Sequence, residues 1–312
     1  MSPGNGGTPA GAAHAHRQAQ TGSNAVKGLA GLPYKVFVPR DPHPGGRVLV
    51  SIHGVSRNAR EHLDLLRPYA ERHGAALIVP SFAADSYRDY QRMGRRGRGP
   101  RADLALIRLL NDVGSRSGLA TDCVDIFGFS GGAQFAHRFA MAHSRRVRRL
   151  VLGAAGWYTM PDHKQPYPYG IADAEGLGGV RLSALAAARL PTLVLVGEHD
   201  DCPDDEELNR TQTVCRSQGL GRLHRAQAWV QAMKAYASVR GESAAVDLQV
   251  LPGVGHSFRD AVIQGGLGSR IFQHCYAPGL NPGLIKQVHN PAEESGTGQV
   301  ACQGHMGGLV ES

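Results

Sequence analysis

The 312-residue sequence lacks the features that mark several classes of protein. No stretch approaches the ~18 consecutive apolar residues of a transmembrane helix, so we expect no membrane span. Residues 1–24 contain no basic segment followed by an apolar one, and therefore do not resemble a signal peptide. Together, these absences predict a soluble protein located in the cytoplasm.

Cysteine is scarce and irregularly placed. The chain has 5 cysteines, and no two have C-x-x-C spacing. An odd count without that spacing argues against a disulfide framework and against a zinc ribbon. Cys202 and Cys215 could pair in an oxidising compartment, but nothing in the sequence requires it.

Aromatic residues are few, at 6%, and none interleaves with the basic clusters of this chain, whose formal net charge is +8. The arginines gather at residues 92–101 and 145–149. Such clusters can bind nucleic acid or acidic ligands, but no nucleic-acid-binding motif accompanies them. We interpret them as solvated surface charge and expect no nucleic-acid partner. A nucleic-acid-binding module built on these clusters is the alternative.

Apolar runs and helical patterns alternate along most of the chain, and 42% of the residues are hydrophobic. Runs rich in Val, Leu and Ile predict strands covered on both faces, at 47–52, 75–80, 123–127, 147–154, 192–196 and 247–251. Apolar residues at helical spacing predict helices over 58–73, 101–117, 132–143, 223–239 and 258–275. This alternation predicts an α/β fold with a mostly parallel sheet.

Both ends of the chain lack this pattern. Residues 1–28 are expected to be a disordered tail, and residues 281–312 a C-terminal extension or tail. The folded domain is expected at 29–280, with an irregular insertion at about 157–189.

One serine follows a predicted strand within a glycine-rich turn. Ser130 lies in Gly-Phe-Ser-Gly-Gly, residues 128–132, between the strand at 123–127 and the helix at 132–143. Glycines around a nucleophilic serine let the strand and the helix approach closely. The motif alone is weak, because a chain with 41 glycines produces such spacings by chance. A glycine-rich turn with an incidental serine is the alternative.

Two further residues follow later strands. Asp200 comes after the strand at 192–196, and His256 after the strand at 247–251. A serine hydroxyl needs a base to take its proton, and the base needs a carboxylate to orient it. The carboxyl ends of parallel strands meet at one edge, and the order Ser, Asp, His is that of strand–turn–helix hydrolases. We predict Ser130 as nucleophile, His256 as base and Asp200 as acid. The competing residues are Glu198, Asp201 and Asp204 for the acid, and His199 and His53 for the base.

Two backbone N–H groups are candidates for an oxyanion hole. Val55 follows the strand at 47–52, and Gly131 directly follows the nucleophile. Two such donors stabilise a tetrahedral oxyanion, and the loss of one typically costs about 3–4 kcal/mol.

Several residues are candidates for a substrate pocket. His53, Trp157 and Tyr158 would line it, although the aromatic residues at 157–169 would equally well pack on the core of their own segment. The arginine-rich loop at 92–101 follows the strand at 75–80, from where it would reach the rim and favour a carboxylate-bearing substrate.

Over residues 32–275 the sequence resembles the α/β-hydrolase superfamily, in its serine esterase branch. It is similar to dienelactone-hydrolase-like and polyhydroxybutyrate-depolymerase-like esterases. The resemblance implies an eight-stranded, mostly parallel sheet with helices on both faces, a short lid insertion, a Ser-His-Asp triad, and neither cofactor nor metal. The motifs that carry it are His53-Gly54, residues 128–132, Gly197-Glu198-His199-Asp200 and Gly255-His256. It assigns to Ser130, Asp200, His256, Val55 and Gly131 the roles given above.

The sequence also departs from parts of that superfamily. Serine at position 130 argues against dehalogenase and epoxide-hydrolase chemistry, which use aspartate, and against dienelactone hydrolase activity itself, which uses cysteine. An HGGG loop is absent after residue 53. The sequence therefore predicts a serine hydrolase that cleaves a carboxylic ester of a small or medium soluble substrate through an acyl-enzyme. An acyltransferase or peptidase with the same triad, or a non-catalytic binding protein, are the alternatives.

Overall fold

The structure is a computed structural model that describes residues 31–43, 46–95, 98–172, 177–202 and 205–276. All of them belong to one compact unit. The tails predicted at 1–28 and 281–312, and Asp204, lie outside the described residues.

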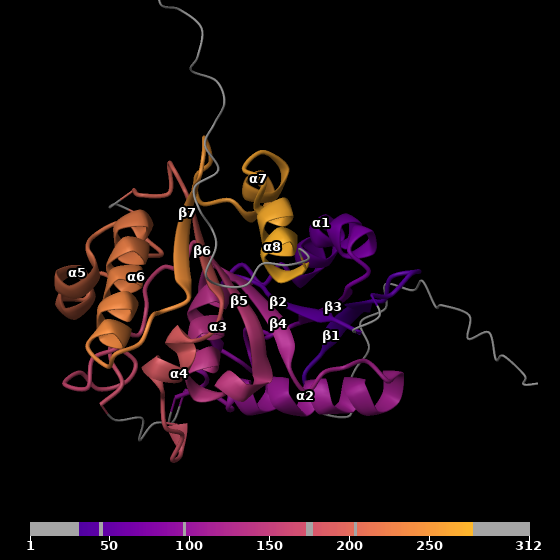
Figure 1. Ribbon diagram of the computed structural model, residues 1–312, viewed down its shortest axis with the longest axis horizontal. Helices are drawn as coiled ribbons and strands as arrows, with labels where there is room; N and C mark the ends of the chain where they lie inside the picture. The colour runs from indigo at the N-terminus through magenta and orange to yellow at the C-terminus, as the bar shows by residue number, and fades with distance from the viewer. Residues whose placement is uncertain (1–30, 44–45, 96–97, 173–176, 203–204, 277–312) are drawn as a thin grey trace, which may run out of the picture. The chain divides into compact units, whose positions relative to one another are not determined.

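Seven strands form one sheet in the order β1-β3-β2-β4-β5-β6-β7 (Figure 1). β1 pairs antiparallel with β3, and every other neighbouring pair is parallel. The predicted α/β class and mostly parallel sheet are therefore confirmed. The strands are β1 (Tyr34–Phe37), β2 (Val48–Ile52), β3 (Ala76–Pro80), β4 (Val124–Phe129), β5 (Val147–Gly153), β6 (Thr192–Gly197) and β7 (Val246–Leu251).

The expected eighth strand is not found in the part of the chain that the structure describes. A single strand, β1, precedes β2 there. Pro39 and Pro42 lie between β1 and β2, and neither has a backbone N–H to donate to a neighbouring strand. The described sheet therefore has one antiparallel edge strand beside its parallel part.

The helices follow the predicted alternation, with one correction. They are α1 (Ala59–Arg72), α2 (Ala102–Ser117), α3 (Gly131–Ala142), α4 (Ala184–Ala188), α5 (Gln212–Gln218), α6 (Arg222–Ser238), α7 (Phe258–Ile263) and α8 (Leu267–Tyr276), with 3-10 turns η1 (Tyr90–Arg92) and η2 (Ser144–Arg146). The prediction of one helix over 258–275 was wrong, because Gly265 and Gly266 separate α7 from α8. Gly266 has φ +68°, which a helix cannot contain. The short helices α4 and α5 were not predicted.

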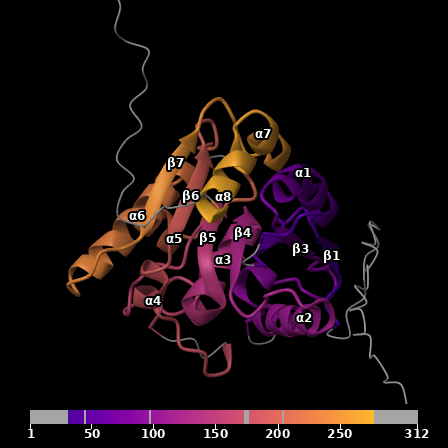
Figure 2. The ribbon, with the colours of Figure 1, turned by 45° about the vertical axis from the view of Figure 1, so that its right-hand side comes forward.

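Helices cover both faces of the sheet (Figures 1 and 2). α1, α7 and α8 pack on one face, and α2, α3, α4 and α6 on the other. Successive strand residues enter opposite cores: Leu49 packs with the first group of helices and Val50 with the second. Because both faces are buried, the strands read as continuous apolar runs.

Most of the described arginines of the two basic clusters form ion pairs or hydrogen bonds within the chain. Arg92 and Arg95 bind the carboxylate of Asp89, so this part of the 92–101 loop is anchored. The other ion pairs of these clusters include Arg101–Asp103, Arg146–Asp122 and Arg148–Asp125. The described residues of the 92–101 loop therefore give no support to the predicted carboxylate-binding rim.

The structure also bears on two other features considered from the sequence, a disulfide bond and a membrane-spanning helix. Cys202 and Cys215 are both free cysteines. None of the described helices is long and apolar enough to cross a membrane.

Three histidines are buried in the interior. His53 Nδ1 donates to the Gly54 carbonyl at 2.8 Å, and its Nε2 accepts from the Phe82 N–H at 3.0 Å. His62 Nδ1 lies 2.8 Å from Ser51 Oγ, and His137 Nδ1 lies 2.9 Å from a backbone carbonyl. Burial lowers the pKa of His53 to about 4, and lowers the pKa values of His62 and His137 well below their ordinary value. All three are therefore neutral at pH 7.

We expect acid to destabilise the fold as the pH falls below about 6.5, the ordinary pKa of histidine. These histidines then bind protons in the unfolded chain but stay neutral in the folded chain, so the free energy of unfolding decreases with falling pH. His53 alone would lower the free energy of unfolding by roughly 2 kcal/mol at pH 5, given its folded pKa of about 4.

Urea unfolding at pH 7.5, 6 and 5 measures this effect. His62→Asn should reduce the pH dependence by about one proton, since asparagine does not titrate. His199→Gln, at an exposed position, should leave it unchanged. A free energy of unfolding that stays constant from pH 7.5 to pH 5 would contradict the prediction.

Candidate active site

Ser130 lies on the turn between β4 and α3, in a strained conformation. Its φ of 53° and ψ of −117° fall where side-chain-bearing residues are rare. Its N–H donates to the Gly153 carbonyl at 2.8 Å, and its own carbonyl accepts from Ala133 and Gln134 at 3.0 and 3.1 Å. The turn is therefore held from β5 on one side and by the first turn of α3 on the other.

Two glycines make this turn possible. A Cβ on Gly132 would lie 2.1 Å from the carbonyl oxygen of Ile52, and a Cβ on Gly128 would lie 2.2 Å from the carbonyl oxygen of Gly132. No side chain fits at such distances, and both contacts are with backbone. The start of α3 therefore lies directly against β2 and β4, as the glycine spacing predicted.

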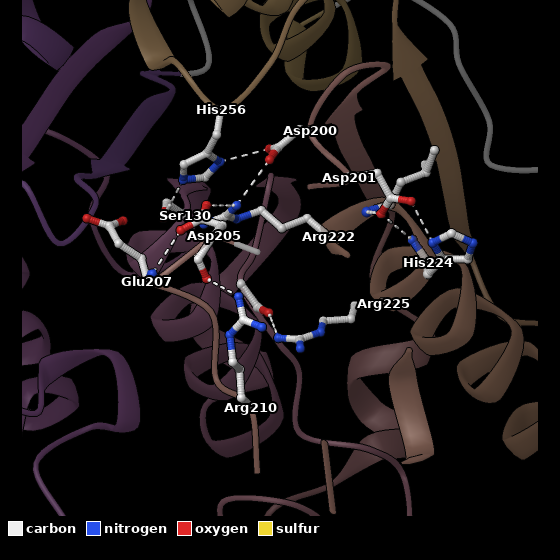
Figure 3. Close-up of polar contacts among 12 residues, drawn as sticks. Ser130, Asp200, Asp201, Asp205, Glu207, Arg210, Arg222, His224, Arg225 and His256 are labelled. Carbon is white, nitrogen blue, oxygen red and sulfur yellow. Dashed lines mark hydrogen bonds and ion pairs between the residues drawn. The ribbon is translucent and has the colours of Figure 1, made fainter. Parts of the chain in front are cut away.

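The structure brings Ser130, His256 and Asp200 together in one line of hydrogen bonds (Figure 3). His256 Nε2 lies 3.1 Å from Ser130 Oγ, and His256 Nδ1 lies 2.8 Å from Asp200 Oδ2. The Asp200 side chain is 2% exposed and that of His256 is 21% exposed. The acid is thus buried behind a base that borders the surface.

The loops that carry acid and base are fitted against each other. A Cβ on Gly197, at the end of β6, would lie 2.3 Å from the Val254 carbonyl of the loop after β7. The His199 N–H donates to that same carbonyl at 3.0 Å. The ring of Phe129 stacks on the His256 imidazole at 5.4 Å between centroids. These contacts fix the imidazole between the acid loop and the end of β4.

The competing acidic residues in the described chain are engaged elsewhere. The Asp201 carboxylate accepts from the N–H of Leu223 at 3.1 Å and pairs with His224 at 2.6 Å. Glu198 accepts from the Gly253 N–H at 2.9 Å. Of these carboxylates, Asp200 alone binds His256.

The two predicted oxyanion donors lie close together beside the nucleophile. A Cβ on Gly131 would lie 3.3 Å from the backbone nitrogen of Val55. The loop of Val55 is held by Tyr90, whose buried hydroxyl donates to the His53 carbonyl at 2.8 Å. Tyr90 was not identified from the sequence, because its contact joins residues 37 positions apart.

The predicted pocket residues are buried in contacts within the domain. His53, Trp157 and Tyr158 are 1%, 4% and 0% exposed. Both ring nitrogens of His53 bind backbone groups, as described above. The Arg138 guanidinium lies 4.4 Å from the Trp157 ring centroid, and Tyr158 stacks on Trp229 at 5.0 Å. The two aromatic rings therefore pack against side chains of α3 and α6, and a role in a substrate pocket stays a prediction.

The described residues of the 157–189 insertion pack on the body of the domain. The Thr159 N–H donates to His137 Nε2 of α3 at 2.9 Å, and the Tyr167 hydroxyl donates to the Arg92 carbonyl at 2.8 Å. The insertion is therefore anchored to α3 and η1.

Sequence reasoning also missed a charged pair behind the triad. Arg222 Nη1 lies 3.2 Å from Asp200 Oδ1, and the same nitrogen binds Asp205 (Figure 3). Burial raises the pKa of Asp205, but the hydrogen bond and charge of Arg222 outweigh it and hold that pKa below its ordinary value. No motif marks Arg222, which is simply the first residue of α6.

No group of three or more His, Cys, Asp or Glu side chains within the described ranges could hold a metal ion.

Comparison with solved structures finds hydrolases of the same fold. The poly(aspartic acid) hydrolase-1 of Sphingomonas sp. KT-1 has a TM-score of 0.65 and 26% identity, covering 77% of this chain and 93% of that one. The poly(3-hydroxybutyrate) depolymerase of Bordetella parapertussis has a TM-score of 0.62 and 25% identity, covering 77% and 90%. An S-formylglutathione hydrolase of Agrobacterium tumefaciens, at 14% identity and TM-score 0.53 over 78% and 88%, shares the fold.

No protein-family model matches the sequence, and no curated protein matches it either. The sheet order, the strand–turn–helix elbow and the structural neighbours nevertheless agree with one another. The chain belongs to the α/β-hydrolase superfamily, with a poly(aspartic acid) hydrolase and a poly(3-hydroxybutyrate) depolymerase among its structural neighbours.

Proposed function

We propose that this protein is a serine hydrolase that cleaves carboxylic ester bonds through an acyl-enzyme intermediate. The unbroken hydrogen-bond line from Ser130 through His256 to Asp200 supports this proposal most directly. Its parts come from loops after three different strands, and together they supply the base and the orienting carboxylate that nucleophilic catalysis by serine requires.

The first half of the reaction forms the acyl-enzyme. His256 Nε2 takes the proton of Ser130 as the serine oxygen attacks the ester carbonyl. The Asp200 carboxylate keeps the Nδ1 proton in place and stabilises the imidazolium that forms. His256 then gives its proton to the departing alcohol.

The second half releases the acid. Water gives a proton to His256 and attacks the acyl-enzyme, and Ser130 leaves with that proton. In both halves the N–H groups of Val55 and Gly131 would hold the negative oxygen.

The polymers named for the two structural neighbours suggest which kinds of bond this protein could cleave. One acts on a polyester of hydroxybutyrate and the other on poly(aspartic acid), whose units are joined by amide bonds. We favour a carboxylic ester of small or medium size, since esters need less activation than amides. A peptidase, an acyltransferase or a binding protein with the same triad are the alternatives.

A fluorophosphonate probe tests whether Ser130 is an activated nucleophile. We expect one equivalent of label per chain, on the peptide that contains Ser130, because only a serine deprotonated by a neighbouring base reacts readily. Peptide mass analysis locates the label, and Ser130→Ala should remove it.

Ser115 provides a matched control, since this exposed serine donates only to a backbone carbonyl of its own helix. Ser115→Ala should label like the wild type. A folded wild-type protein that takes up no label would overturn the proposal and favour the binding-protein alternative.

Two neighbouring aspartates distinguish the catalytic acid from a helix cap. Asp200→Asn should lower kcat by roughly 10³ to 10⁴, because the imidazole loses its orienting charge. Asp201→Ala should lower stability by about 1 kcal/mol, because it removes the oxygen that accepts from the first N–H groups of α6, and should change kcat little. Ester kinetics and urea unfolding of both variants separate the two effects; equal losses of kcat would contradict the assignment.

Matched ester and amide substrates test the bond that is cleaved. With the same acyl group, we expect ester turnover to exceed amide turnover in kcat/KM. Adding an alcohol acceptor should not divert the acyl group from water. Preferred cleavage of the amide, or transfer to the alcohol, would favour the peptidase or the acyltransferase.

A further inference from the structure

The catalytic acid shares its second oxygen with a buried cation. Asp200 Oδ2 serves His256 at 2.8 Å, while Asp200 Oδ1 lies 3.2 Å from Arg222 Nη1. The side chains of Asp200 and Arg222 are each 2% exposed, so water screens this contact little. The contact therefore fixes the plane of the carboxylate that faces His256.

Asp201, in the acid loop, binds the start of α6, the helix that carries Arg222. Arg222 is the first residue of α6, whose N-terminal N–H groups at Leu223 and His224 point to Asp201 Oδ1 at 3.1 and 3.4 Å. A Cβ on Gly221 would lie 1.9 Å from that oxygen. The acid loop thus places Asp200 on the base and Asp201 on the helix that carries Arg222.

A cation at this position also has a cost for catalysis. The imidazolium formed at His256 is stabilised by the negative charge of Asp200, and a lone arginine beside that carboxylate would largely cancel it. Asp205 removes this conflict, because its Oδ2 binds the same Nη1 of Arg222. The three groups together carry one negative charge.

We propose that Arg222 is a positioning residue that holds Asp200 toward His256, and that Asp205 offsets its charge. The proposal rests on the serine hydrolase function proposed above. Neither Arg222 nor Asp205 contacts the reacting atoms.

Other charged groups of the described chain lie around this cluster (Figure 3). The buried Tyr158 is also near, since burial and then the charge of Asp200 raise its pKa. Arg225, on α6, donates to the carbonyls of Gly156, Asn209 and Gly219. Arg210 donates to the Asp205 carbonyl, and Glu207 contributes its backbone N–H to the Asp205 carboxylate. On the far side Asp201 pairs with His224. Among the neighbouring side chains that the structure describes, Arg222 alone joins the two aspartates Asp200 and Asp205.

The test is the pH dependence of kcat/KM for an ester substrate, whose acidic limb reports protonation of the free base. Arg222→Met leaves two carboxylates near His256, so the limb should move to higher pH by about 0.5–1 unit. Asp205→Asn leaves Arg222 uncompensated, so the limb should move to lower pH by a similar amount.

The double variant separates charge from position. In Arg222→Met/Asp205→Asn the net charge returns to that of the wild type, so the limb should return as well. Its kcat should stay about tenfold to a hundredfold below wild type, because Asp200 is no longer held. KM should change little in all three variants, since neither residue touches the substrate.

Two variants serve as controls. Arg225→Met removes a buried arginine of the same helix that binds backbone carbonyls, so it should lower stability without a comparable shift of the limb. Glu207→Gln removes an exposed carboxylate of the same loop and should leave the limb and kcat unchanged.

Shifts of the same sign in Arg222→Met and Asp205→Asn, or no shift in folded variants, would overturn the inference. An equal shift in Arg225→Met would do so too, because it would show a general loss of structure. These outcomes require an active wild-type enzyme labelled at Ser130. A wild type that is neither labelled nor active would instead contradict the proposed function.

Discussion

The close contact between the start of α3 and β2 is the constraint on which the site depends. Gly132 leaves no space for a Cβ above the Ile52 carbonyl, and this contact presses the elbow against the sheet. The unfavourable φ of 53° at Ser130 destabilises the turn by on the order of 1–3 kcal/mol, which the surrounding hydrogen bonds must offset. The same region brings Gly131 beside Val55, so one close backbone approach sets the positions of both Ser130 and the predicted oxyanion donors.

The parallel sheet then determines what can reach that serine. Ser130, Asp200 and His256 follow β4, β6 and β7, so their loops meet at one edge of the sheet although long stretches of sequence separate them. Adjacency of β6 and β7 brings acid and base loops together, and Gly197 lets the acid loop lie against Val254. The sheet topology places the two loops next to each other, and the absence of a side chain at Gly197 lets them come into direct contact.

The sequence allowed the prediction of those parts that local pattern specifies. Apolar runs marked the strands, and residues directly after them include Ser130, Asp200 and His256. Arg222 and Tyr90 were beyond reach, because their roles arise from contacts 22 and 37 residues away that no spacing encodes. The aromatic side chains after β5 illustrate another limit. Composition shows that a ring is apolar, but not whether it faces a substrate or the core.

The predicted acid and base have different surroundings, and in the proposed mechanism this difference matters for catalysis. His256 stacks on the apolar ring of Phe129, which offers no charge to stabilise an imidazolium. In the proposed mechanism that stabilisation comes mainly through Asp200, whose effective charge is set by Arg222 and Asp205. A buried arginine that bound Asp200 alone would gain orientation at the expense of basicity. Sharing Arg222 between two carboxylates keeps the orientation while returning most of the charge to the base.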